Sequence, residues 1–372
     1  MAKYKLGEIC EFYSGTGFPV TYQGKAIGDF PFYKVGDIAN NVVAGNVYLS
    51  LCNNYISNQD ALEIKGTIIP KDTVVFAKIG EALKLNRRAL TSCNCLIDNN
   101  AMGIAPKRKF LQTGYFFYFM KNLKLQNFAE STTVPSVRKS KLEQIEIETP
   151  PLNTQNEVER TLDKISSLIT IRQHQLQKLD ELIKARFVEM FGMPGTDTKG
   201  WGLQYLGTCC ELNPKKGTDK RLVSGLSVSF VPMPAVSESG KIDASQIKAY
   251  DEVKTGFTYF AENDVLFAKI TPCMENGKGA VAVGLCNNIG FGSTEFHILR
   301  PINNKSNPYW LYSLTSFDAF RKDAADNMTG SAGQRRVPAV FLEKYKVTLP
   351  PIELQNQFAA FVEQTDKSKV VA

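Results

Sequence analysis

The sequence predicts an α+β protein with two tandem globular α/β domains, separated by long helices that form an antiparallel coiled coil. Two observations predict this fold class: a heptad pattern in the middle of the chain, and a set of motifs that occurs twice. The length corresponds to about two or three domains, each able to bury its own core. We expect globular domains at 1–151 and 193–351, a central helix at 152–192 and a short helix at 352–372.

The central stretch carries apolar side chains in steps of four and three residues over about five heptads, the spacing of a coiled-coil seam. No Gly or Pro interrupts residues 152–191, and Gly192 and Pro194 then end the pattern. Such a helix would reach roughly 60 Å at about 1.5 Å per residue, longer than one compact domain needs. The residues that we expect at a helix–helix interface are Val158, Leu162, Ile165, Ile169, Leu176, Leu179 and Ile183.

The segment that opens the central helix occurs twice. Pro150-Pro151-Leu152 followed by Gln155-Asn156 recurs as Pro350-Pro351-Ile352 followed by Gln355-Asn356. The second stretch, 352–372, is about half as long as the central one. We therefore expect two antiparallel helices that cover each other's seams, and the shorter one either fits only part of the central seam or is truncated.

The two globular regions also share strand motifs. Asp72-Thr73-Val74-Val75-Phe76-Ala77-Lys78-Ile79 is echoed by Asp264-Val265-Leu266-Phe267-Ala268-Lys269-Ile270. Each predicts a buried strand that ends in a lysine and leads into a polar loop. The repeated strand motifs with different loops between them indicate that the two domains share one fold and differ in their surface loops.

These loops supply the candidate DNA contacts. Arg, Asn, Gln and Glu side chains match base edges, whereas Lys and backbone amides suit phosphates. The net charge of +7 fits an anionic partner. The candidates in the first domain are Lys78, Lys84, Asn86, Arg87, Arg88, Ser136, Arg138 and Lys139. Those in the second are Lys269, Thr271, Glu275, Asn276, Lys278, Gln334, Arg335 and Arg336.

No catalytic or cofactor motif emerges. The chain has no G-x-x-x-x-G-K loop, only two histidines, and eight cysteines without a CxxC pair, so neither a phosphate-binding loop nor a metal site is expected. Asn307-Pro308-Tyr309-Trp310 lacks the second proline of an adenine methyltransferase box. No stretch approaches 18 apolar residues, which predicts no membrane association, and scattered unpaired cysteines favour a cytoplasmic location.

The order of these motifs resembles that of the specificity (S) subunits of type I restriction–modification systems. The resemblance rests on the tandem lobes, the doubled Pro-Pro-x-x-x-Gln-Asn, and Phe187 to Pro194 before Lys199-Gly200-Trp201. It implies two target-recognition domains, each of which reads half of a bipartite site in double-stranded DNA. It also implies helices that dock methyltransferase (modification) subunits, and a restriction motor-nuclease subunit. S-adenosylmethionine, ATP and Mg²⁺ would then belong to those partners, and this chain would hold no cofactor and catalyse nothing.

Two other functions remain open from the residues alone. One is a DNA methyltransferase or nuclease with an unrecognised catalytic site; methylation or cleavage by the purified chain would reveal it. The other is a structural adaptor that keeps the fold without reading DNA. Binding to random against selected duplexes separates that adaptor from a sequence reader.

Overall fold

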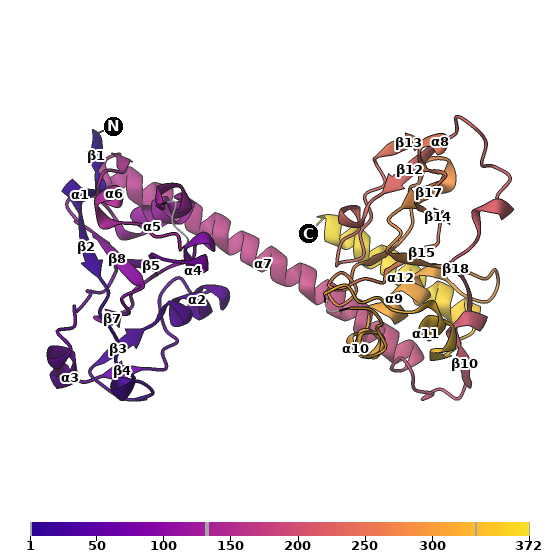
Figure 1. Ribbon diagram of the computed structural model, residues 1–372, viewed down its shortest axis with the longest axis horizontal. Helices are drawn as coiled ribbons and strands as arrows, with labels where there is room; N and C mark the ends of the chain where they lie inside the picture. The colour runs from indigo at the N-terminus through magenta and orange to yellow at the C-terminus, as the bar shows by residue number, and fades with distance from the viewer. Residues whose placement is uncertain (1, 131–133, 332, 372) are drawn as a thin grey trace. The chain divides into compact units, whose positions relative to one another are not determined.

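The computed structural model describes residues 2–130, 134–331 and 333–371 (Figure 1). The chain divides into two compact units, Met1–Thr170 and Ile171–Ala372, here called lobe one and lobe two. The division falls inside helix α7 (Leu152–Phe191), to which both lobes contribute. Among the described residues, no helix is both long and apolar enough to cross a membrane.

Lobe one contains two sheets of three or four strands and a two-stranded one, and of the two larger sheets the proximal one lies nearer to α7 than the distal one does (Figure 1). The proximal sheet is antiparallel and has the order β2 (Cys10–Ser14), β8 (Ala101–Pro106), β5 (Val74–Ala77), β6 (Arg88–Leu90). The distal sheet has the order β4 (Tyr55–Ile56), β3 (Phe30–Tyr33), β7 (Leu96–Ile97), with β3 and β7 parallel. β1 (Ala2–Lys5) pairs antiparallel with β9 (Glu146–Thr149) and so joins the two ends of the lobe. Its helices are α1 (Leu6–Ile9), α2 (Val35–Val43), α3 (Asn58–Glu63), α4 (Glu81–Lys84), α5 (Thr113–Asn122) and α6 (Lys139–Glu143), with 3₁₀ turns η1 (Val20–Tyr22) and η2 (Leu125–Phe128).

Lobe two repeats this arrangement. Its proximal sheet has the order β11 (Cys210–Leu212), β18 (Phe296–Pro301), β15 (Val265–Ala268), β16 (Gly279–Val281). Its distal sheet has the order β13 (Ile247–Ala249), β12 (Ser227–Val231), β17 (Ile289–Gly292), β14 (Thr258–Ala261), with β12 and β17 parallel. β10 (Leu203–Tyr205) pairs with β19 (Lys346–Thr348). Its helices are α8 (Tyr250–Val253), α9 (Pro308–Ser316), α10 (Asp318–Asp326), α11 (Ala339–Lys344) and α12 (Ile352–Val371), with 3₁₀ turns η3 (Leu206–Thr208), η4 (Lys216–Thr218), η5 (Met233–Ala235) and η6 (Cys286–Asn288).

The two proximal sheets have four strands each in corresponding order, and each distal sheet contains one parallel pair. The predicted α+β fold class and the predicted internal repeat are therefore confirmed. The distal sheets differ at β14, which forms a full strand beside β17. Among the described residues of lobe one, the corresponding pairing is a single antiparallel bridge between Ile69 and Cys95.

The doubled Pro-Pro-x-x-x-Gln motif has a direct physical explanation. Gln155 and Gln355 are each 0% exposed. The Gln155 amide donates to the carbonyls of Pro150 and Phe110, both at 2.8 Å, and its oxygen accepts from the Gln112 N–H at 2.8 Å. Each amide thus joins the start of its helix to the turn that precedes α5 or α9, and it satisfies backbone groups that burial would otherwise leave unpaired.

In lobe two, Gln355 makes the same three bonds. It donates to the carbonyls of Pro350 at 2.8 Å and Lys305 at 3.0 Å, and it accepts from the Asn307 N–H at 2.8 Å. The recurrence of one hydrogen-bond pattern in both lobes explains why this motif, rather than a purely apolar one, precedes both long helices.

The C-terminal part of α7 packs against α12 within lobe two. Phe358 of α12 lies edge-on to Phe187 and Phe191, with ring centroids 5.5 and 5.4 Å apart. Farther along α12, the Lys369 ammonium lies 2.7 Å from Asp180. Residues later in α12 contact residues earlier in α7, so the two helices run antiparallel here, as predicted.

The predicted helix–helix seam is covered only in part. Val158, Leu162, Leu179 and Ile183 are half-buried, and Ile183 packs on the lobe-two core. Ile165, Ile169 and Leu176 are 47, 53 and 37% exposed, so the pairing predicted for these three is not made within the described residues. The reason is length: α12 has 20 residues against 40 in α7, and its ion pair at Lys369 reaches back only to Asp180.

Replacing Gln355 with Leu tests the glutamine bonds. The variant leaves three backbone groups without their side-chain partner, at about 1–3 kcal/mol for each buried group. The free energy of unfolding of lobe two should therefore fall by several kcal/mol. The measurement is urea unfolding followed by tryptophan fluorescence, since both tryptophans, Trp201 and Trp310, lie in lobe two. The control is Gln364→Leu, an exposed glutamine on the same helix. Equal stability of the two variants would contradict the role assigned to Gln355.

Candidate nucleic-acid interface

Lobe two brings the predicted loop residues together. The segment after β15 and the segment before α11 are joined by bridges that Arg336 makes with Ile270 and Thr329. The Val337 N–H donates to the Lys269 carbonyl at 2.9 Å, and the Thr271 N–H donates to the Arg335 carbonyl at 3.0 Å. Two loops that are distant in sequence therefore form one surface, here called the lobe-two loop pair (residues 269–278 and 329–337).

The two arginines of this surface have different partners. Arg336 makes a forked contact with Glu295, with Nη2 2.8 Å from Oε1 and Nε 2.9 Å from Oε2. Arg335 makes a single contact with Glu275, at 3.3 Å. Forked charge-assisted bonds are the stronger kind. Arg336 thus anchors its loop, whereas Arg335 keeps most of its donors available.

The remaining candidates of lobe two lie on the same loops. The Thr271 hydroxyl donates to the Gly333 carbonyl at 3.1 Å, which ties the two loops together. Lys278 is half-buried and its ammonium lies 3.4 Å from the Met233 carbonyl. Gln334 and Asn276 are exposed. Their side chains are available to a ligand on this surface.

His297 on β18 fixes the base of the loop pair. Its Nε2 lies 2.8 Å from the Val337 carbonyl, and its Nδ1 lies 3.1 Å from the amide nitrogen of Asn213. Asn213 Oδ1 accepts from the Ile298 N–H at 3.1 Å, so its amide nitrogen is the group that faces the ring. These contacts suit a neutral imidazole with its proton on Nε2. Burial lowers the pKa of His297 and so favours the same neutral form.

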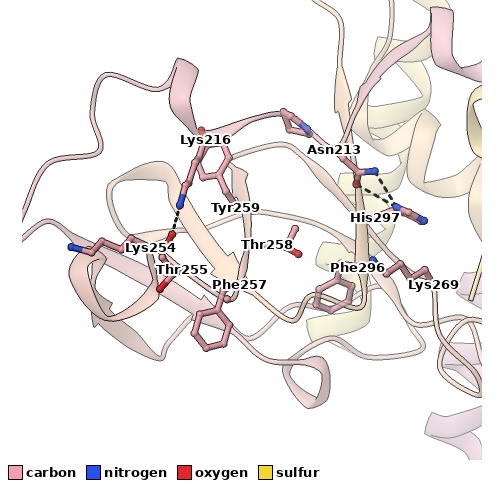
Figure 2. Close-up of a pocket in the computed structure, with 12 residues that line it drawn as sticks. Asn213, Lys216, Lys254, Thr255, Phe257, Thr258, Tyr259, Lys269, Phe296 and His297 are labelled. Atoms are coloured by element: carbon pink, nitrogen blue, oxygen red, sulfur yellow. Dashed lines mark hydrogen bonds between the residues drawn. The ribbon is translucent and has the colours of Figure 1, made fainter. Parts of the chain in front are cut away.

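An open cleft adjoins the loop pair (Figure 2). It has a volume of about 560 Å³ and lies where β18 and the segments that follow β11 and β15 meet the start of β14. Figure 2 shows Lys269 at one end and Phe257 toward the other. The cleft, here called the lobe-two cleft, is lined by Asn213, Pro214, Lys216, Lys254, Thr255, Gly256, Phe257, Thr258, Tyr259, Lys269, Phe296 and His297.

Lobe one builds the same frame. Ser136 bridges both Ile79 and Glu130, as Arg336 does with Ile270 and Thr329. The Val137 N–H donates to the Lys78 carbonyl at 2.9 Å, as the Val337 N–H does to Lys269. Arg138 pairs with Glu130 at 2.9 Å. The frame of the two loop surfaces is therefore shared, while the side chains on it differ.

Arg88, predicted as a DNA contact, is buried, whereas Asn86 is half-buried. Arg88 is 4% exposed, and its guanidinium donates to the carbonyls of Asn86 and Leu123. The Asn86 side chain accepts from Arg88 at 2.8 Å. Arg88 lies in β6, all three residues of which are buried, so this basic residue supports the lobe and does not face a ligand.

The other candidates of lobe one stay on the surface. Lys84 is exposed and pairs with Glu81 at 2.6 Å, while Lys139 pairs with Glu143 at 3.6 Å. Exposed pairs of this kind contribute little to stability and can exchange partners. Arg87 and Lys78 are half-buried, and no hydrogen bond or ion pair of either side chain is found among the described residues.

Sequence reasoning missed the acidic partners that hold these loops. Glu295 pairs with Arg336, and buried Asp264 makes a forked pair with Arg300 at 2.7 and 2.8 Å. One signal was present for Asp264: it opens the repeated strand motif, as Asp72 does in lobe one, and Asp72 pairs with Arg108 at 2.9 Å. Within the described part of the chain, no group of three or more His, Cys, Asp or Glu residues could hold a metal ion.

Comparison with known sequences gives consistent matches. The family model described as the type I restriction modification DNA specificity domain matches residues 1–181 and 225–370. The chain is 40% identical over 161 residues to the type I restriction enzyme EcoAI specificity subunit of Escherichia coli, covering 42% of this chain and 26% of that protein. It is 37% identical over 185 residues to the EcoEI specificity subunit of Escherichia coli, covering 49% and 30%. These matches span less than a third of the relatives' length.

Two solved structures share the fold. One is the crystal structure of a type I restriction–modification S subunit from M. genitalium, with a TM-score of 0.53 and 13% identity, covering 99% of this chain and 90% of the other. The second comes from a study of complex assembly and conformational transition of the type I R-M system, with a TM-score of 0.51 and 17% identity, covering 100% and 91%. At these identities the likeness concerns the fold alone.

Acidification should weaken lobe two through His297. Its folded pKa is lowered, so as pH falls through about 6.5 the unfolded chain takes up a proton that the folded lobe resists. The free energy of unfolding should then fall by up to about 1.4 kcal/mol per pH unit from this one group. Urea unfolding at several pH values from about 7.5 to about 5.5, which bracket the ordinary pKa of histidine, measures how the free energy of unfolding changes with pH.

The variant His297→Gln retains a donor for the Val337 carbonyl and should flatten this slope. His174→Gln, an exposed histidine on α7, serves as the matched control and should leave the slope unchanged. The charged groups that face the imidazole are Lys269 and Glu295. A His297→Gln slope equal to that of the wild type would rule out His297 as the titrating group.

Proposed function

Since the chain belongs to the type I restriction modification DNA specificity domain family, we propose that it is a sequence-specific DNA-recognition subunit of a type I restriction–modification complex. Each lobe recognises one half of a bipartite site in double-stranded DNA. The long helices dock methyltransferase subunits, and a motor-nuclease subunit joins for restriction. S-adenosylmethionine, ATP and Mg²⁺ bind to those partner subunits. This chain recognises the DNA and catalyses no reaction.

One observation carries this proposal: two lobes with the same strand order present different side chains on the same loop frame. A duplicated scaffold with divergent basic tips suits a site with two unlike halves. Arginine, glutamine and glutamate on the loop pair are the side chains that hydrogen-bond base edges in the major groove, and lysines neutralise phosphates. An adaptor without DNA recognition would have no need of different tips on identical frames.

The decisive experiment is selection of duplexes from a random pool by the full chain assembled with its modification subunits. We expect enrichment of one bipartite motif. The purified chain alone, given S-adenosylmethionine or Mg²⁺, tests the catalytic alternative. Binding without sequence enrichment would favour the structural adaptor, and methylation or cleavage by the chain alone would favour an enzyme.

We expect some residues of the lobe-two loop pair to contact bases and others to contact phosphates. Arg335→Lys removes a fork that can hold a guanine bidentately, so selectivity at one base position should relax by about 1–3 kcal/mol. Lys269→Met should weaken all duplexes alike and lower the salt dependence of log K by about one phosphate contact. The measurement is binding of a panel of duplexes with single base changes, at several salt concentrations.

Two controls accompany these variants. Lys346→Met changes an exposed lysine on β19, outside the loop pair, and should leave binding unchanged. Arg336→Met should lower the melting temperature of lobe two, because it leaves Glu295 without its forked partner. If Arg335→Lys and Lys269→Met bind every duplex as the wild type does, the loop pair is not the DNA contact.

The lobes should also be exchangeable as separate readers. Each lobe closes on itself through pairing of its first and last strands, β1 with β9 and β10 with β19. Replacing residues 203–348 by the matching lobe of a relative should keep one half-site and change the other. The measurement is the methylated-adenine motif in the genome of cells that carry the chimera with its partner subunits; a change in both halves would refute independent reading.

A further inference from the structure

The lobe-two cleft is lined by basic side chains. Its lining includes Lys216, Lys254 and Lys269 but no aspartate or glutamate. The Lys216 ammonium donates to the Lys254 carbonyl, and the Lys254 ammonium pairs with Asp251 at 3.1 Å. Lys269 differs from both, because its ammonium makes no hydrogen bond or ion pair with any described residue. The cleft therefore holds one cation that is available to a ligand.

The surroundings of Lys269 favour an anion at this place. The side chain is half-buried, and burial lowers its pKa. A bound anion would replace the solvation that burial removes from the ammonium group. Glu295, the nearest acid that acts on it electrostatically, is already committed to Arg336. The polar groups of the cleft thus leave the Lys269 charge without a partner of its own.

An exposed aromatic ring lies toward the other end of the cleft. Phe257 is 38% exposed, and it packs edge-on against Phe230 at a centroid distance of 4.9 Å and an angle of 88°. Lys248 in turn lies 4.0 Å from the centre of the Phe230 ring. This packing holds Phe257 in place while leaving part of its ring open to the cleft, which is the arrangement of a stacking platform for a planar base.

A hydrogen-bonding group lies between the two ends. Figure 2 places Thr258 between Phe257 and Lys269. The Thr258 hydroxyl has no hydrogen-bond partner among the described residues. A hydroxyl suits the sugar or the base edge of a ligand that reaches from ring to ammonium.

We propose that the lobe-two cleft binds a single nucleotide, with the base stacked on Phe257 and the phosphate at Lys269. This site goes beyond the recognition of duplex DNA by the loop pair, because it takes a base that is free to stack on protein. Two sources share that chemistry: a free nucleoside monophosphate, and an unpaired nucleotide of a DNA strand. The cleft volume of about 560 Å³ is large enough for one nucleotide.

The site belongs to lobe two alone. Phe257 lies just before β14 and Thr258 is its first residue, and among the described residues of lobe one a single Ile69–Cys95 bridge takes the place of this strand. Nucleotide binding should therefore show one site per chain.

Isothermal titration calorimetry of the full chain tests the proposal. The probes are deoxyadenosine monophosphate, thymidine monophosphate, deoxyadenosine and inorganic phosphate. We expect each monophosphate to bind at one site, at least about tenfold more tightly than the nucleoside or phosphate alone, because base stacking and charge act together. Phosphate binding as tight as nucleotide binding, or no nucleotide binding at millimolar concentration, would overturn the proposal.

Variants separate the two ends of the cleft. Phe257→Leu keeps the apolar volume but removes the aromatic face, and Lys269→Met removes the charge while keeping the stem; each should lower nucleotide affinity about tenfold or more. Phe257→Trp should retain binding, and Lys346→Met serves as the control outside the cleft. Melting temperatures of all variants confirm that they are folded. If nucleotide affinity is the same in Phe257→Leu and Lys269→Met as in the wild type, the site lies elsewhere.

Two DNA probes identify the source of the nucleotide. If the cleft takes an unpaired nucleotide of a strand, oligothymidylate should compete with thymidine monophosphate. A duplex with a single-nucleotide bulge should then bind more tightly than the intact duplex, and Phe257→Leu should abolish that gain. If only the monophosphates bind, the ligand is a free nucleotide. Selection of duplexes on the same preparation keeps this result separate from the proposed function, because selectivity can persist when no nucleotide binds.

Discussion

The buried glutamines at the start of the two long helices are the constraint on which the rest of each lobe depends. Gln155 and Gln355 each join the Pro-Pro turn at the start of its helix to the segment that precedes α5 or α9. A side-chain amide without partners at 0% exposure would be costly, whereas one with three partners is specific for a single arrangement. The amide thereby fixes where the helix leaves the lobe, and the neighbouring strands β9 and β19 are fixed with it.

The loop surfaces add a second layer that can vary without disturbing this frame. In both lobes backbone bridges hold the loop foot, so side chains at the tip are free to differ. Acidic residues form ion pairs with several of the basic ones. These pairs are Glu295 with Arg336, Glu275 with Arg335, and Glu130 with Arg138. Part of the positive charge is thus neutralised within the protein, which limits affinity for any polyanion and leaves fewer, better-positioned donors for discrimination.

The elements that local periodicity specifies could be predicted from the sequence. The heptad steps gave the extent of α7, and the repeated apolar runs gave β5 and β15, because those signals lie within one element. Features that depend on distant partners could not be predicted. In the sequence Arg88 cannot be told from its basic neighbours, and only the position of β6 shows that its side chain is buried. The partner of Arg336 is Glu295, which lies 41 residues away in the sequence. The exposure of Ile165 and Ile169 is a different case, because it follows from the short reach of α12, and the sequence does show that the second helix is the shorter one.

The exposed middle of α7 has a consequence for how the chain melts. Ile165, Leu168, Ile169 and Ile171 are all about half exposed, so this part of the helix is supported mainly by its own backbone hydrogen bonds. Short stretches of helix without tertiary packing are marginally stable in water. Loss of structure in one lobe therefore has little means of propagating through the helix to the other. The protein should behave as two cooperative units joined by a weak coupling, and heating should give two calorimetric transitions instead of one.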